Sequence, residues 1–208
     1  MGGWRSLQSG TTWADRPGVG ASTAFLIAAS AVLAVLMAGA VSFNRFVRER
    51  NHVREAWSNV DTELRRRHDL IPNLVEAVKG YAAHERATLE AVIRARSVAS
   101  LQTGDAGEHV DSERGLVRSI RDLLAVAEQY PTLKADRHFS DLQSQLVETE
   151  DRIQLARRIY NANVRDLNRR IESFPSNVVA GLAGFVPAEF FEVEESLRQR
   201  APSADFAA

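Results

Sequence analysis

The feature that most constrains this chain is a run of 23 residues, Ala21 to Phe43, that contains no charged side chain. As an α-helix with a rise of 1.5 Å per residue, this run would be about 34 Å long. That length matches a hydrocarbon core of about 30 Å crossed at a modest tilt. We therefore predict a tail over residues 1–20, a transmembrane helix held in the lipid bilayer over residues 21–43, and a separate domain over residues 44–208.

The apolar run has two other interpretations. A cleaved signal peptide would explain the small residues Ala38-Gly39-Ala40, which resemble a cleavage site. However, the residues before the run include Asp15, and the run is long for the apolar part of a signal peptide. The core helix of a globular protein seldom stays uncharged over such a length. An uncleaved anchor is the prediction that fits best.

The charges that flank the run predict its orientation. Arg5 and Arg16 precede it, and four arginines follow directly: Arg45, Arg48, Arg50 and Arg54. Because basic residues are enriched on the cytoplasmic side, we expect a single-pass protein of the cell (inner) membrane. Its N-terminal tail would lie outside and its C-terminal domain in the cytoplasm.

Small residues recur at every fourth position of the run, at Ser30, Ala34, Ala38 and Ser42. Such a stripe would allow two membrane helices to approach closely. An alanine-rich segment also produces such stripes by chance. Assembly into a homo-oligomer is therefore an alternative rather than the prediction.

Composition excludes several classes of protein. The 208 residues include 26 basic and 27 acidic side chains, so the net charge of −1 argues against nucleic acid as a partner. The absence of cysteine excludes disulfides, thiolate metal sites and a cysteine nucleophile. It is also compatible with a domain in the cytoplasm.

Beyond the apolar run, hydrophobic residues recur at helical spacing. One stripe comprises Val53, Trp57, Val60, Leu64, Ile71, Leu74, Val78 and Tyr81. Arg67 occupies the core-type position in the middle of this stripe, which predicts a buried carboxylate partner or a break that lets the side chain reach solvent. Pro72 either kinks this helix or begins a second one capped by Asp69. The spacing leaves both alternatives open.

The next segment, residues 103–112, is polar and contains two glycines, which is typical of a loop. Asp111 or Ser112 is the expected cap of the helix that follows. The buried face of that helix is predicted at Leu116, Ile120, Leu123, Ala127 and Tyr130. Pro131 is expected to end it.

The most regular stripe alternates steps of three and four, at Phe139, Leu142, Leu146, Thr149, Ile153, Ala156, Tyr160, Asn163 and Leu167. Such a repeat is typical of a helical bundle or coiled coil. Ile171 and Phe174 extend it. No long segment alternates as a strand would. The predicted fold is all-α: an N-terminal transmembrane helix followed by an elongated antiparallel bundle of three to four long helices.

The C-terminal segment is rich in phenylalanine and interrupted by glycine and proline. We expect Phe185, Phe190, Phe191 and Phe206 to fold back on the end of the bundle, because large apolar side chains are usually buried.

No complete catalytic or cofactor motif is present. Phosphate-binding glycine loops and a nucleophile elbow are absent. His84-Glu85 begins like a zincin helix, but Thr88 replaces the second histidine. Glu49 and His52 have the spacing of a di-metal bundle motif but lack its second copy. We predict no catalytic residue, no cofactor and no metal ligand.

Carboxylates crowd together in the last long stripe. Glu148, Glu150 and Asp151 are followed by several arginines, which predicts a solvated, ion-paired face.

Long blocks of this sequence resemble the LemA family of membrane-anchored bacterial proteins. They comprise Glu55 to Asp61, Leu64 to Glu76, Val78 to Glu85, Leu142 to Asn161, Phe174 to Asn177, Gly184-Phe185 and Phe190 to Glu192. The resemblance implies one N-terminal membrane helix, a short outside tail and a helical bundle. It implies no reaction, because the molecular function of the family is uncertain. Residues 104–115 match the family pattern weakly.

The expected function is that of a non-enzymatic, membrane-anchored scaffold that presents a bundle surface to an unknown membrane or cytoplasmic protein. The candidate partner-binding surface lies in the second block, at Arg65, Arg66, His68, Asp69, Asn73 and Glu76. One alternative is a self-assembling protein that organises the membrane. The other is a hydrolase that uses His68 or His84 with nearby carboxylates.

Overall fold

The computed structural model describes residues 17–193, and all regular secondary structure in that range is helical. Its helices are α1 (Pro17–Lys79), α2 (Arg86–Ser100), α3 (Ala106–Ala127), α4 (Pro131–Lys134), α5 (Arg137–Glu172) and α6 (Ser176–Ala183). The chain divides into two compact units between Asn44 and Arg45, and α1 is continuous through this boundary. The prediction of an all-α fold is confirmed.

The first unit contains one segment that is long and apolar enough to cross a membrane by its length and composition. The mean hydropathy of its best window is 2.5, and no residue of that window is buried in the protein. Large apolar side chains such as Phe25 and Leu33 are 73% and 62% exposed. A helix that is apolar all round needs an apolar environment, which lipid would supply.

In the second unit, α1 is continuous through Pro72 to Lys79, so the proline does not begin a new helix. Proline has no N–H to donate to the carbonyl oxygen four residues earlier, which is that of His68. The Nε atom of Arg96 on α2 donates to this oxygen at 2.7 Å. The bond that Pro72 removes is therefore replaced from a neighbouring helix.

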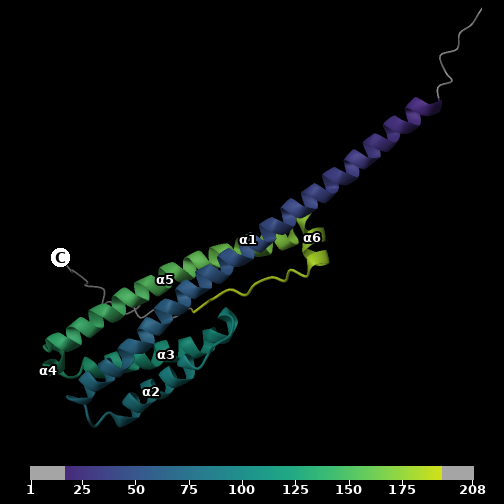
Figure 1. Cartoon of the computed structure of the whole chain (residues 1–208). Helices are drawn as coiled ribbons and strands as arrows, with labels where there is room; N and C mark the ends of the chain where they lie inside the picture. The colour runs from purple at the N-terminus through teal and green to yellow at the C-terminus, as the bar shows by residue number, and fades with distance from the viewer. Residues whose placement is uncertain (1–16, 194–208) are drawn as a thin grey trace, which may run out of the picture. The chain divides into compact units, whose positions relative to one another are not determined.

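Helices α1 and α5 are antiparallel within this unit. Polar contacts connect Glu49 with Arg170, the His52 carbonyl with Asn163, and Tyr81 with Asp136, at 2.7, 3.3 and 3.0 Å. The residue numbers on α5 fall as those on α1 rise. Figure 1 shows α5 beside the later part of α1, with α2 and α3 packed as a pair. The predicted bundle therefore has four long helices.

The bundle contains two apolar cores. In the first, the α1 residues Ile71 to Val78 meet α2, α3, α4 and the beginning of α5. In the second, the α1 residues Phe46 to Leu64 meet the later part of α5, α6 and the C-terminal segment. The α5 stripe is confirmed from Phe139 to Leu167, where every position is buried or half-buried. Phe174 is 84% exposed, so its place in the stripe was wrong, because α5 already ends at Glu172.

The boundaries of α3 also differ from the prediction. The helix begins at Ala106, with Asp105 rather than Asp111 or Ser112 in the capping position. The prediction of a loop over residues 103–112 was therefore wrong from Ala106 onward. His109 and Glu113 extend the buried face of α3 toward its N-terminus. Pro131 lies beyond the end of α3 and begins the short helix α4.

The segment after α5 includes a helix that sequence reasoning missed. Gly184 ends α6 in the left-handed conformation with φ of 70°, which costs glycine little. Beyond it, Phe185 stacks on Phe46 with ring centroids 4.9 Å apart, and Phe191 is buried. Phe190 is 39% exposed. Phe206 lies outside the described residues, so the prediction of folding back is confirmed for Phe185 and Phe191 alone.

Two asparagines of α5 hold this segment against the bundle. The Asn168 amide donates to the Ala188 carbonyl at 2.9 Å and accepts from its N–H at 2.8 Å. The Asn161 amide does the same with Phe191, at 3.1 and 3.0 Å. The Tyr160 hydroxyl donates to the Glu189 carbonyl at 2.8 Å. Each asparagine thus satisfies both backbone groups of one extended residue.

Candidate functional site

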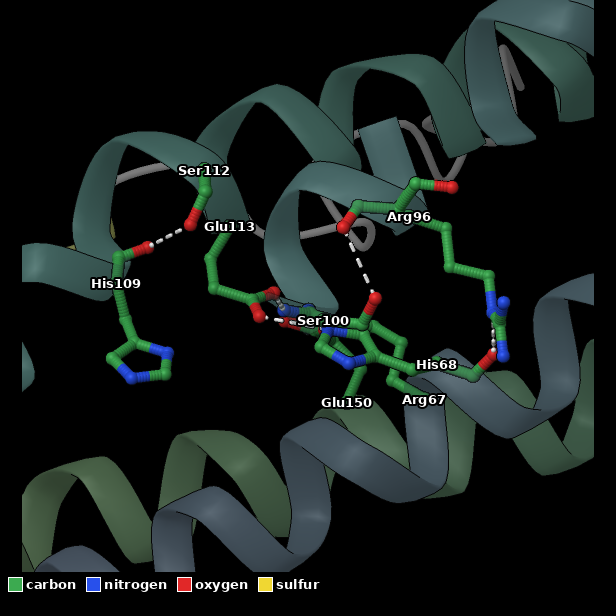
Figure 2. Close-up of polar contacts among 9 residues, drawn as sticks. Arg67, His68, Arg96, Ser100, His109, Ser112, Glu113 and Glu150 are labelled. Atoms are coloured by element: carbon green, nitrogen blue, oxygen red, sulfur yellow. Dashed lines mark hydrogen bonds and ion pairs between the residues drawn. The ribbon is translucent and has the colours of Figure 1, made fainter. Parts of the chain in front are cut away.

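A cluster of charged side chains lies between the two apolar cores. Arg67 of α1 bonds to Glu113 of α3, and its Nη1 atom lies 2.9 Å from Glu150 of α5 (Figure 2). The three side chains are 2%, 0% and 6% exposed. The prediction of a buried carboxylate partner for Arg67 is therefore confirmed, and two carboxylates fill that role.

His68 of α1 completes the cluster, with its Nε2 atom 2.8 Å from the second oxygen of Glu113. Burial by itself raises the pKa of the Glu113 carboxyl. The hydrogen bond from His68 and the charge of Arg67 outweigh burial and hold this pKa below its ordinary value. An ionised carboxylate only accepts hydrogen bonds, so His68 is the donor in this contact.

The position of the cluster follows from the helical repeat. Arg67 continues the apolar stripe of α1, and Glu150 follows the buried Thr149 in the stripe of α5. The interpretation of Glu150 as part of a solvated face was therefore wrong. It holds for its neighbour Glu148, which is exposed and pairs with Arg152 at 2.6 Å. In this location the cluster joins α1, α3 and α5 and is closed to solvent.

A second buried group surrounds Trp57. The sequence predicted apolar stripes that include Trp57 and Tyr160, but it did not predict that His109 joins them. The Trp57 ring contacts the rings of His109, Phe191 and Tyr160, with centroids 5.2, 5.3 and 5.5 Å apart. Burial raises the pKa of Tyr160 to about 12, and the charges of Asp105 and Glu189 act in the same direction. The spacing of His109 seven residues before Leu116 could have indicated its buried position.

The predicted partner-binding residues do not all share one surface. Four of them, Arg65, Arg66, Asp69 and Asn73, line a groove of about 710 Å³ on α1. Its other lining residues are Ser58, Asp61, Thr62 and Leu70. We call these eight residues the α1 groove. The other two predicted residues lie elsewhere.

His68 is 7% exposed and belongs to the buried cluster, so its assignment to the surface was wrong. His68 lies three residues after the exposed Arg65, which favours a place on the same face of the helix. Spacing along α1 gives no indication that the imidazole reaches Glu113 on another helix. Glu76 is exposed and lies 3.6 Å from Lys79, outside the residues that line the groove.

The remaining titratable candidates are scattered. His84 lies exposed in the turn between α1 and α2, far along the chain from the buried His68. Glu49 pairs with Arg170, while His52 lies 4.0 Å from Glu55 on the surface of α1. Within residues 17–193, no group of three or more histidines or carboxylates is arranged to hold a metal ion.

Comparison with known proteins agrees with the fold. The sequence profile of the LemA family matches residues 56–206. The magnetosome protein MamQ 2 of Paramagnetospirillum magneticum is 28% identical over 80% of this chain and 71% of its own length. Protein LemA of Metamycoplasma hominis is 28% identical over 73% of this chain and 69% of its own length. The family match includes α2, α3 and α5, together with most of the α1 residues that pack against them, and the chain therefore belongs to the LemA family.

Proposed function

We propose that this protein is a membrane-anchored, non-enzymatic scaffold whose bundle presents the α1 groove to a protein partner. In this proposal, the apolar part of α1 spans the cell membrane with the N-terminus outside and the bundle in the cytoplasm. The excess of arginine after the apolar run supports this orientation. Neither His68 nor His84 has a catalytic role in it.

The observation that carries the proposal is the polarity of the α1 groove. Arg65 and Arg66 are exposed on one part of it and interact with Asp61 and Glu63 of the same helix, at 2.8 and 3.8 Å. Surface pairs of this kind are weak and can exchange partners at little cost. A groove with two cations, two carboxylates and an amide suits a protein surface with complementary charges.

The further groove residues Asp69 and Asn73 are also exposed. Neither forms a hydrogen bond or ion pair with another side chain in the described part of the chain. Their polar groups are thus open to a partner.

Photo-crosslinking in cells tests this proposal. A photoreactive amino acid replaces Asn73 in the full-length chain, and the matched control replaces the exposed Ser144 of α5. We expect a discrete protein adduct from position 73 that is lost when Arg65→Glu and Arg66→Glu are added. Identical adducts from both positions, or an adduct that survives the charge reversals, would contradict the proposal.

Self-assembly is the second candidate function, because one exposed surface of the bundle is apolar. Leu155 and Ile159 are 55% and 51% exposed, and they line a groove of about 370 Å³ with Ala56 and Ala156. In the cysteine-free chain, Leu155→Cys would form a disulfide-linked dimer on oxidation if two copies met at this groove. A chain that stays monomeric under these conditions excludes this mode of assembly.

A further inference from the structure

Helix α6 has one face packed on the bundle and one apolar face that the bundle leaves uncovered. Ala180 is buried and Val179 is packed against the second apolar core. Val178 and Leu182 are one turn apart, so they share a face, and they are 54% and 87% exposed. Soluble surfaces rarely leave adjacent large apolar side chains this open.

Two more exposed apolar residues flank the helix in the sequence. Phe174 precedes α6 and is 84% exposed, and Val186 follows it and is 75% exposed. We call Phe174, Val178, Leu182 and Val186 the α6 apolar surface. Its residues fall within 13 positions of the sequence.

The residues around α6 indicate what could cover this surface. Phe185, directly after the cap of α6, stacks on Phe46 of α1, and Ala180 belongs to the same core as Phe46. Phe46 follows Phe43, the end of the apolar run, by three residues. Three residues of helix rise only about 4.5 Å. A membrane helix that ends at Phe43 therefore places Phe46 in the headgroup region.

Basic side chains occupy the same end of the bundle. Arg45 and Arg48 are exposed on the first turn of α1 in the second unit, and the side chain of Arg169 on α5 is 71% exposed. The guanidinium of Arg50 lies over the ring of Phe185, 5.2 Å from its centroid. Basic residues beside an apolar surface are typical of segments that bind an anionic bilayer surface.

From this arrangement we infer that the α6 apolar surface enters the headgroup and acyl boundary of the bilayer that α1 crosses. The inference rests on the proposed membrane anchor. It assigns α6 a lipid-binding role that is separate from the α1 groove. The arginines at this end of the bundle would contact lipid phosphates while Leu182 and its neighbours contact acyl chains.

Site-directed spin labelling of the full-length chain tests this inference, and the absence of native cysteine makes every label unique. The test variant is Leu182→Cys. The matched control is Ile93→Cys, because Ile93 is an apolar residue of α2 that is 49% exposed. A third variant, Leu33→Cys, reports on the anchor. Each protein is reconstituted in vesicles of phosphatidylcholine and phosphatidylglycerol, and the label is exposed to oxygen and to a water-soluble nickel complex.

We expect a several-fold higher ratio of oxygen to nickel accessibility at position 182 than at position 93, because oxygen partitions into lipid and the nickel complex does not. Equal ratios at both positions, with position 33 in lipid, would overturn the inference and leave the anchor standing. Protection of position 182 from both reagents would mean that protein covers α6, which also overturns it. A water-accessible label at position 33 would overturn both the anchor and the inference.

Discussion

Arg67 carries a positive charge into a layer of the bundle where its side chain is 2% exposed. Its neighbours Arg65 and Arg66 are on the surface, because each residue of a helix is rotated by about 100° from the one before. Removing a charge from water is costly, and two carboxylates offset this cost. Removing Arg67 would leave Glu113 and Glu150 buried beside each other without their cation.

The substitution Arg67→Ala is therefore expected to destabilise the protein by about 3–5 kcal/mol. Arg65→Ala removes the same side chain from an exposed position and is expected to cost less than about 0.5 kcal/mol. Denaturant unfolding of the full-length chain in detergent micelles, followed by far-ultraviolet circular dichroism, measures both. Equal losses for the two variants would show that Arg67 is not a buried structural cation.

Glu113 makes stability depend on pH in a predictable direction. Because its pKa is lower in the folded protein, the ionised form stabilises the fold above the unfolded value of about 4.3. This contribution is lost as the pH falls through the folded pKa. The difference in unfolding free energy between wild type and Glu113→Gln should be largest near neutral pH and shrink below about pH 4. A difference that stays constant with pH would contradict this account.

At the level of secondary-structure elements, Arg96 has a role in α1 although it belongs to α2. The carbonyl of His68 loses its helical donor at Pro72, and Arg96 supplies another. An unsatisfied carbonyl in this half-buried position costs about 1–3 kcal/mol. The contact therefore couples the path of α1 through its proline to the packing of α2.

A double-mutant cycle tests this coupling. Arg96→Ala alone should destabilise the fold by about 1–3 kcal/mol, because the carbonyl is left without a donor. In a Pro72→Ala background the same change should cost less, because the N–H of the new alanine bonds to that carbonyl. Unfolding free energies of the four proteins give the interaction energy. A value near zero would show that Arg96 does not compensate for the proline.

Two asparagines of α5 hold the C-terminal segment, because their spacing along the helix matches the spacing of their partners in the segment. Asn161 and Asn168 are seven residues apart, which is two turns of α5 and a rise of about 10.5 Å. Their partners Phe191 and Ala188 are three residues apart, and three extended residues span about 10 Å. The two asparagines can therefore pair with the same extended segment without distorting it.

Replacing either Asn161 or Asn168 with alanine should release this segment, because each change removes two hydrogen bonds. Amide hydrogen exchange over residues 185–193 should become faster, by a factor of about 10 for a loss of about 1.4 kcal/mol. Asn163→Ala is the matched control, because Asn163 bonds to the His52 carbonyl instead. Equal acceleration of exchange in all three variants would contradict the role of Asn161 and Asn168 in holding this segment.

At the scale of the whole molecule, periodicity predicted the helices and failed at their polar positions. The stripe of α5 was found because its buried residues are mostly apolar, and Arg67 was noticed because it interrupted an apolar stripe. The first turns of α3 were missed because their buried face carries His109 and Glu113. Polar residues are buried only where a distant partner exists, and a single sequence does not show which residues become neighbours.

The candidate partner-binding surface could be predicted only where its residues are related by spacing along one helix. Arg65, Arg66, Asp69 and Asn73 share the α1 groove because of helical spacing, which can be read along one segment. The burial of His68 depends on α3, 45 residues away. The α6 apolar surface could not be predicted, because it depends on how the chain turns after Glu172.

The central claim is that this protein is anchored in the cell membrane with its bundle in the cytoplasm, and labelling of single cysteines with a membrane-impermeant maleimide tests it most directly. Ser9→Cys reports on the N-terminal tail, and Glu148→Cys reports on the exposed face of α5. In intact spheroplasts we predict labelling of position 9 alone, with position 148 labelled only after lysis. Labelling of position 148 in intact spheroplasts, or recovery of the protein in the soluble fraction after lysis, would contradict the account.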